Sequence, residues 1–218
     1  MGEIIWLTVK LASLTTLLLL VIATPLAWWL ARSKRWWREI IAAVTALPVV
    51  LPPTVLGFYL LIALGPDSPL MSLLRPFGVR TLAFTFPGLV IGSMIYSLPF
   101  AIQPLREAFT ATGGQPREIA ATLGAGSLRT FVEIEAPLAQ RGFVTAAILV
   151  FAHTIGEFGV VLMIGGAIPG RTEVLSTKIY ELVESQQYGA AHGLAAGLLL
   201  FAFCVVLTTL LIGRERRA

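Results

Sequence analysis

Five long apolar runs leave this chain few ways to fold. A bilayer core of about 30 Å takes about 20 helical residues per crossing, so the 218 residues have room for about five or six spans and no separate soluble domain. Only 13% of the residues are charged, against about 25% in an average soluble protein. We therefore expect an all-α, polytopic membrane bundle. Its predicted spans are 7–31, 40–64, 82–104, 142–164 and 190–213.

The basic residues between the apolar runs predict how the bundle is oriented. If the polar segment 105–141 lies inside the cell, eleven of the 16 Lys and Arg residues lie inside and five outside. The positive-inside rule then places the amino terminus outside and the carboxyl terminus in the cytoplasm. We interpret the net charge of +4 as a topology signal and expect no nucleic-acid partner. The inner residues are Arg32, Lys34, Arg35, Arg38, Arg106, Arg117, Arg129, Arg141, Arg214, Arg216 and Arg217.

The segment LPVVLPPTVLG interrupts the second apolar run with three prolines, Pro48, Pro52 and Pro53. Each proline removes a backbone donor, so a helix cannot continue there unbroken. In a bilayer, the freed carbonyl groups are tolerated only where they are buried in protein or face a water-filled cavity. The break therefore indicates either part of a transport path or a packing kink, and both interpretations stay open.

The polar segment EIAATLGAGSLRTFVEIEAP predicts two short amphipathic helices between the third and fourth spans. Pro116 suits the first helical position, and Glu118 in the first turn complements the helix dipole. Gly124 can take the left-handed conformation that ends the first helix. We expect Ser127 to cap the second helix and Pro137 to stop it. Such a pair needs a groove in which to lie.

The spacing within this segment resembles the coupling-loop signature of ABC importer permeases. That signature reads Glu-Ala-Ala, three residues, Gly, nine residues and Ile-x-Leu-Pro. The matching residues are Glu118, Ala120, Gly124, Ile134 and Pro137. The chain departs from the signature twice, because Ile119 replaces the first alanine and Ala136 replaces the leucine.

The resemblance implies that 105–141 is a cytoplasmic coupling loop, which docks into a cleft of an ATPase subunit. Gly124 would act as the hinge between the two docking helices. The residues expected to make this contact are Glu118, Ala120, Ala121, Gly124, Ala125, Ile134 and Pro137.

Three further segments narrow the resemblance. GEFG in the fourth span resembles the molybdate, tungstate and sulfate branch of these permeases. LPVVLPPTVLG and the segment IPGRTEVLSTKIY, which precedes the last span, are similar to molybdate members in particular. The resemblance thus implies a type I ABC importer permease fold with five transmembrane helices, most simply for molybdate, with tungstate or sulfate as alternatives.

The same resemblance implies the assembly in which the chain works. Two copies would form a homodimer in the bacterial cytoplasmic membrane and pair with two ATPase subunits. ATP and magnesium would be bound by those ATPase subunits, so we expect no catalytic site, metal or cofactor in this chain. A periplasmic or surface-anchored binding protein would deliver the oxyanion to the outer side.

Two ionisable residues, His153 and Glu157, lie well inside the predicted fourth span. They are four positions apart, so on a continuous helix they would share a face. Ionisable residues at this depth are costly and usually functional. Because a bare carboxylate would repel an anion, we interpret Glu157 as a structural or gating group that bonds to a neighbouring helix or to protonated His153. Gly156 and Gly159 are expected to let another helix approach closely.

Passage of an oxyanion requires hydrogen-bond donors that do not trap charge. Intramembrane hydroxyl groups and the backbone near helix breaks can supply them, although Ser and Thr often bond only to their own helix. The candidates for the path or gate are Pro52, Pro53, Thr54, Ser97, Thr154, Gly156, Glu157 and Gly159, and further hydroxyls worth locating are Thr45, Ser93 and Thr145.

Two rival functions make different demands on the sequence. A secondary transporter or channel without an ATPase would favour intramembrane charge pairs or an inverted repeat, and neither is visible. An intramembrane enzyme using His153 and Glu157 as acid and base would need a third polar group at a fixed place. The sequence contains no P-loop, H-E-x-x-H or G-x-S-x-G motif.

Overall fold

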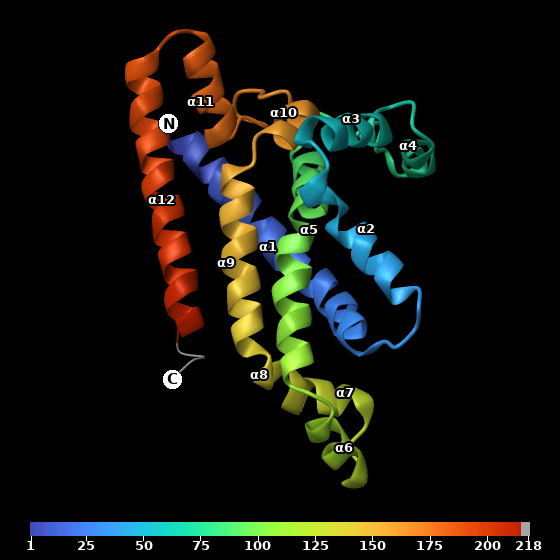
Figure 1. Cartoon of the computed structure of the whole chain (residues 1–218). Helices are drawn as coiled ribbons and strands as arrows, with labels where there is room; N and C mark the ends of the chain where they lie inside the picture. Colours follow the sequence, from blue (N-terminus) through green and yellow to red (C-terminus); the bar gives the residue numbers. More distant parts are fainter. Residues whose placement is uncertain (215–218) are drawn as a thin grey trace.

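The protein is a helical bundle in the computed structural model, which describes residues 1–214 and the side chains through residue 210. No strand occurs among those residues. Helices α1 (Gly2–Arg32), α5 (Phe86–Ala111) and α9 (Gln140–Gly156) form the centre, and α12 (Tyr188–Arg214) stands beside α9 (Figure 1). The all-α fold expected from the apolar runs is confirmed.

Four helical segments of the described chain are long and apolar enough to cross a membrane. Counting α9 together with the helical segment before it, to which it is joined by a 70° bend, gives a fifth. The four are Gly2–Arg32, Pro53–Phe77, Phe86–Ala111 and Tyr188–Leu210. Their boundaries differ from the expected spans in the second, third and fourth apolar runs.

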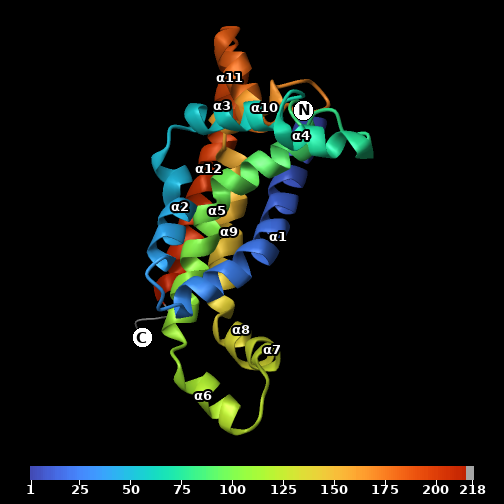
Figure 2. The same cartoon turned by 90° about the vertical axis from the view of Figure 1, so that its right-hand side faces the viewer.

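The second apolar run forms two helices instead of one span from 40 to 64. Between α2 (Arg38–Val50) and α3 (Pro53–Leu64) lie two residues with extended backbone, the second of which is Pro52. Pro52 and Pro53 lack a backbone N–H, so the helix stops at the predicted break. Figures 1 and 2 show that α3 then turns away from the direction of α2. The connection after α3 contains the helical turns α4 (Pro69–Leu74) and η1 (Arg75–Phe77).

Helix α5 begins at Phe86 and continues to Ala111, although we expected the third span to cover 82–104. The extension is held by packing against α9, because Ala108 and Phe109 of α5 are buried. A Cβ atom placed on Gly142 of α9 would stand only 2.4 Å from the Cβ of Ala108. The two helices therefore touch almost backbone to backbone, and the expected coupling loop begins later than residue 105.

The coupling loop folds into α6 (Gln115–Thr122), α7 (Ser127–Thr130), the π-helix η2 (Phe131–Glu135) and α8 (Ala136–Leu138). Two local predictions were wrong. Ser127 is the first helical residue, and Gly126 occupies the cap position. Pro137 lies inside α8, and the helical segment continues past it to Leu138 instead of stopping before it.

The fourth apolar run is also divided, and a continuous span over 142–164 is not formed. Helix α9 ends at Gly156, Glu157 has extended backbone, and α10 (Gly159–Gly165) starts two residues later. Helix α11 (Leu175–Glu184) follows before the last span. In Figure 1, α10 lies beside α3, so the two broken runs meet.

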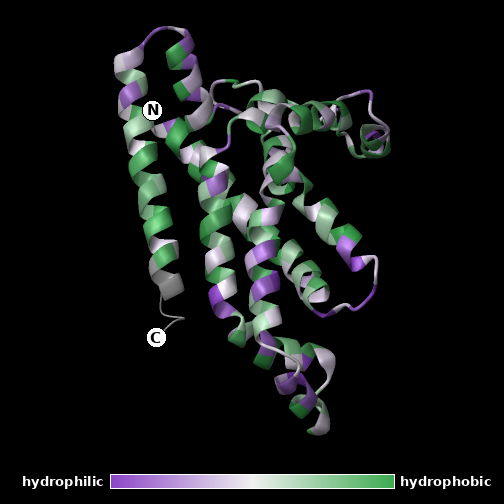
Figure 3. Ribbon diagram, viewed as in Figure 1, coloured by the Kyte–Doolittle hydropathy of each residue, from purple (hydrophilic) through white to green (hydrophobic). Residues whose placement is uncertain are grey.

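The elements gather at two ends of the bundle. The amino terminus, α3, α4, α10 and α11 lie at one end, and the coupling loop projects from the opposite end (Figure 2). Figure 3 shows hydrophilic residues concentrated in the coupling loop and in the connection between α1 and α2, whereas α12 is mostly hydrophobic. None of the 18-residue apolar window of α12 is buried within this chain, as expected for a helix that faces lipid or another subunit.

Candidate functional site

A cavity of about 500 Å³ lies where the two broken runs meet. Its wall combines the start of α3, one face of α5, and the turn between α9 and α10. The expected path residues Pro52, Ser97 and Thr154 are not part of the wall. The lining residues are Pro53, Thr54, Tyr96, Ala152, His153, Gly156, Glu157, Phe158 and Gly159.

The Glu157 carboxylate caps the helix that follows it. Its Oε1 atom accepts a hydrogen bond from the N–H of Val160 at 2.7 Å, and Oε2 accepts one from Val161 at 3.1 Å. The side chain is only 3% exposed, so these bonds take the place of water. The bond to protonated His153, one of the two alternatives expected for Glu157, is not formed, because the helix ends at Gly156 and the two residues do not share a helical face.

His153 is held by two aromatic neighbours and one polar neighbour. Its ring stacks on Phe100, with centroids 4.2 Å apart, and lies 4.9 Å from Tyr96. The Nδ1 atom is 2.9 Å from the Ser97 hydroxyl. No hydrogen bond to Nε2 is formed within the part of the chain that the structure describes, so this atom is free for a molecule in the cavity.

Ser97 and Thr154 support the site from behind the cavity wall. The Ser97 hydroxyl is fully buried and lies 3.3 Å from the Thr154 hydroxyl, which donates to the carbonyl of Val150 at 2.8 Å. Both residues were predicted as path residues, but the Ser97 hydroxyl bonds to His153 and the Thr154 hydroxyl bonds to the backbone. They position His153 and do not line the cavity.

The two glycines beside Glu157 differ in their surroundings. A Cβ atom on Gly159 would stand 2.6 Å from the Cβ of Pro53, which fits the close approach expected there. A Cβ atom on Gly156 would meet nothing within 4 Å, so the close contact expected at that position is not made within this chain. Gly156 instead leaves the cavity open.

The loop 166–174 and α11 brace the turn at Glu157. The Ser176 hydroxyl donates to the carbonyl of Glu157 at 2.6 Å, and the N–H of Leu175 donates to Thr8 of α1 at 2.9 Å. Within the loop, the Thr172 hydroxyl donates to the carbonyl of Gly165 at 2.6 Å. The segment IPGRTEVLSTKIY therefore ties α1, α10 and the cavity wall together.

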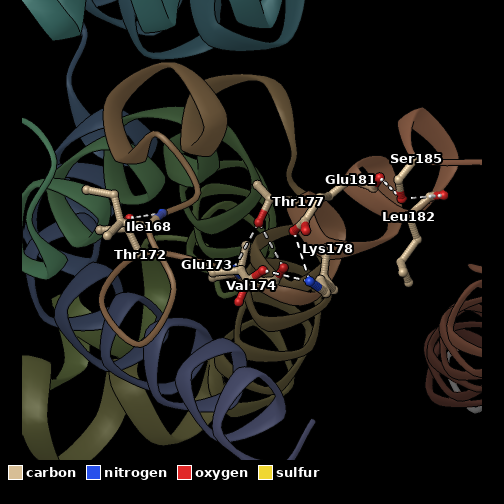
Figure 4. Close-up of polar contacts among 9 residues, drawn as sticks. All are labelled: Ile168, Thr172, Glu173, Val174, Thr177, Lys178, Glu181, Leu182 and Ser185. Carbon is tan, nitrogen blue, oxygen red and sulfur yellow. Dashed lines mark hydrogen bonds and ion pairs between the residues drawn. The ribbon is translucent and has the colours of Figure 1, made fainter.

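Three charged residues hold the start of α11 in place (Figure 4). The Lys178 ammonium lies 3.2 Å from Glu173 and 2.9 Å from Glu181. The hydrogen bond to Glu181, and then that to Glu173, raises the pKa of Lys178 above its ordinary value. The bond from Lys178 in turn lowers the pKa of Glu181. This group lies outside the membrane-spanning segments.

At the opposite end, the coupling loop presents apolar side chains that the described part of the chain leaves uncovered. Ile119, Leu123, Leu128 and Val132 are all more than half exposed. A soluble surface would not normally carry such a cluster, so it indicates a contact surface for another protein.

The turn between α6 and α7 has the predicted left-handed glycine. Gly124 has φ +79°, and its N–H donates to the carbonyl of Ala121 at 3.0 Å. The N–H of Ala125 donates to the carbonyl of Ala120 at 2.9 Å, which completes a Schellman cap. Among the remaining expected contact residues, Glu118, Ala121 and Pro137 are exposed, Ala125 and Ile134 are half-buried, and Ala120 is buried.

One buried acid in the coupling loop escaped the sequence analysis. Glu135 forms an ion pair with Arg32 of α1, and its other oxygen accepts a hydrogen bond from the Trp28 indole at 2.6 Å. We call Trp28, Arg32 and Glu135 the latch. Glu135 lies four residues after Phe131 on an apolar face, which is the signal that could have marked it as buried.

Residues 23–215 match the family described as binding-protein-dependent transport system inner membrane component. The chain belongs to this family. The chain is 57% identical over 200 residues to the molybdenum transport system permease protein ModB of Azotobacter vinelandii. This match covers 92% of the chain and 88% of the relative. The chain is 31% identical to ModB of Escherichia coli K12, over 96% and 90% of the two chains.

The fold of this inner membrane component also has a solved counterpart. A bacterial alginate ABC transporter, crystallised in complex with an alginate-bound periplasmic protein, matches with a TM-score of 0.71. The match covers 99% of this chain and 77% of the other, at 18% identity. The expected ABC importer permease fold is therefore confirmed.

Proposed function

We propose that the chain is the permease subunit of an ATP-driven importer that carries molybdate across the cytoplasmic membrane. Support for the mode of action comes from one observation above all: an uncovered apolar helix pair, with a Schellman turn at Gly124, projects from the bundle. A surface of this kind needs a partner. Support for molybdate comes from the 57% identity to a molybdenum transport permease along nearly the whole chain.

The proposed assembly contains two copies of this chain and two ATPase subunits, which bind ATP and magnesium. ATP binding closes the ATPase dimer and pushes α6 and α7. The bundle then tips between inward-open and outward-open states. A binding protein delivers the anion at the end that carries the amino terminus and α11, which we place outside the cell.

The cavity at the two helix breaks is the proposed anion path. Molybdate is a dianion, so a fixed positive charge at this depth would hold it too tightly to release it. A neutral imidazole and the Thr54 hydroxyl can donate hydrogen bonds without that penalty. The nearby Glu157 carboxylate is already occupied by the N–H groups of Val160 and Val161, which reduces its repulsion of the cargo.

His153 can serve as such a donor in one tautomer. The Ser97 hydroxyl is nearer to Nδ1 of His153 than to the Thr154 hydroxyl, at 2.9 Å against 3.3 Å. When Ser97 donates to Nδ1, the ring proton resides on Nε2, the atom without a partner. An oxyanion in the cavity favours this arrangement because it then receives an N–H bond.

The test is uptake of radioactive molybdate by proteoliposomes that contain the chain and its ATPase, with the binding protein added on the side that carries the amino terminus. We expect accumulation only when ATP and the binding protein are both present. Competition by tungstate and sulfate measures which oxyanion is preferred, and a clear preference for sulfate would overturn the molybdate assignment. Accumulation against a gradient by the chain alone would instead support an ATP-independent transporter.

A further inference from the structure

The latch joins two parts of the chain that are far apart in sequence. Trp28 and Glu135 are separated by 107 positions, and the Glu135 side chain is almost completely buried. Arg32 lies with its guanidinium carbon 5.0 Å from the centre of the Trp28 ring, so the three side chains form one closed group. They connect the last two turns of α1 to the end of η2.

The buried Glu135 carboxylate depends on its two partners in the latch. A buried carboxylate is stable only when charge and hydrogen bonds replace water, and Arg32 and Trp28 each engage one of its oxygens. Removing one partner would leave the other as an unpaired charge in a buried place. The latch is therefore sensitive to the loss of either charged residue.

The surroundings of the latch leave the coupling loop room to move. An apolar groove of about 790 Å³ lies between α1 and the coupling loop, with Val21 and Pro25 on one wall and Leu128 and Ala136 on the other. Trp28 and Phe131 close it, with ring centroids 5.9 Å apart. Contact between α1 and the loop is thus concentrated at the latch end of the groove.

The backbone before Glu135 also departs from an ordinary helix. Residues Phe131–Glu135 form a π-helix, a conformation that is rare and found mostly at functional sites. Phe131 and Glu135, at the two ends of this turn, both reach α1, where they meet Trp28.

We propose that the latch is the connection through which the coupling loop moves α1 during transport. This inference rests on the proposed function, because it assigns a role within the ATP-driven cycle. Glu135 is then a positioning residue: it contacts neither nucleotide nor cargo, and it makes α1 follow the loop. Breaking the latch should separate ATP hydrolysis from uptake.

The experiment compares uptake per ATP hydrolysed among matched variants in proteoliposomes. Glu135→Gln and Arg32→Gln each remove one charge of the latch, whereas Arg32→Lys keeps it. Glu133→Gln is the control, because it breaks the exposed pair between Arg129 and Glu133 two positions away. We expect uptake per ATP to fall at least fivefold in the first two variants and less than twofold in the other two.

A second measurement follows the movement itself. In a Cys204→Ser background, spin labels at Val21→Cys and Leu128→Cys, both highly exposed positions, report the width of the groove. With the latch intact, ATP should leave this distance unchanged. With Glu135→Gln, ATP should increase the mean distance between the labels or broaden the distribution of distances.

The outcomes separate the latch from the function on which it rests. If the unmodified protein shows no ATP-dependent uptake, the proposed function is wrong. If it does, and Glu135→Gln keeps normal uptake per ATP, the latch proposal is overturned. A variant that assembles in smaller amounts but transports normally per ATP would also overturn it, since the role would then be structural only.

Discussion

Gly159, the first residue of α10, lies directly against Pro53, the first residue of α3. A Cβ atom on Gly159 would stand 2.6 Å from the Cβ of Pro53, closer than side chains normally approach. Each residue follows the break in one of the two divided apolar runs. The two breaks therefore form a single packed unit, which builds one side of the cavity.

Replacing Gly159 by alanine should destabilise the protein, because a proline ring cannot move aside as a flexible side chain can. We expect a loss of about 1–3 kcal/mol, in the range typical of overpacking. Thermal unfolding in detergent measures it, with Gly156→Ala as the control because that position opens into space. An unchanged unfolding temperature for Gly159→Ala would show that the contact is loose.

Replacing Glu157 by glutamine should leave uptake largely intact. The amide oxygen can still accept from the backbone N–H groups of α10, so the cap survives without the charge. Glu157→Ala leaves those N–H groups without an acceptor and should cost about 1–2 kcal/mol of stability. Molybdate uptake and thermal unfolding of both variants test this. Loss of uptake in a well-folded Glu157→Gln variant would mean that the charge itself is used.

Replacing His153 by leucine should lower molybdate uptake about tenfold, since the loss of one hydrogen bond to a charged group is worth about 1.5–3 kcal/mol. His153→Gln keeps an N–H donor and should lose less. Initial uptake rates are compared with binding of the ATPase subunit, which should not change in either variant. Equal rates for the leucine and glutamine variants would argue against a donor role.

Replacing Gly124 by valine should impair the coupling loop, because φ of +79° is strained for a β-branched residue. The expected cost is about 1 kcal/mol or more. Asparagine tolerates this conformation better, so Gly124→Asn is the matched control. The measurement is transport-coupled ATP hydrolysis. Normal coupling in Gly124→Val would contradict the proposed role of Gly124 as a hinge.

Replacing Lys178 by methionine should narrow the pH range over which α11 is stable. The lowered pKa of Glu181 means that its ion pair stabilises α11 less as pH falls. The raised pKa of Lys178 means that its ion pairs stabilise α11 less as pH rises. The contribution to stability is complete between the ordinary pKa values, about pH 4.3 and 10.4, and amounts to about 1 kcal/mol or less for the pair with the exposed Glu181. Hydrogen exchange in α11 at several pH values measures the difference. A constant difference at all pH values would exclude the ion pairs as its cause.

The sequence predicts the coupling loop better than it predicts the cavity. The coupling loop was largely predictable, because its helices depend on local features: Pro116 in the first turn, Glu118 near the helix start and a left-handed Gly124. The cavity was predicted only in part. Spacing suggested that His153 and Glu157 share a face, but the helix ends between them.

The sequence by itself determined the class of the protein, since apolar run length, the placement of Lys and Arg, and turn chemistry are properties of short stretches. Tertiary structure alone decided which distant groups meet. Glu135 reaches Arg32 and Trp28, and Pro53 reaches Gly159, only because the packed helices bring residues more than 100 positions apart into contact. Such pairings depend on how helices pack across the bundle, and a single sequence carries no local signal for them.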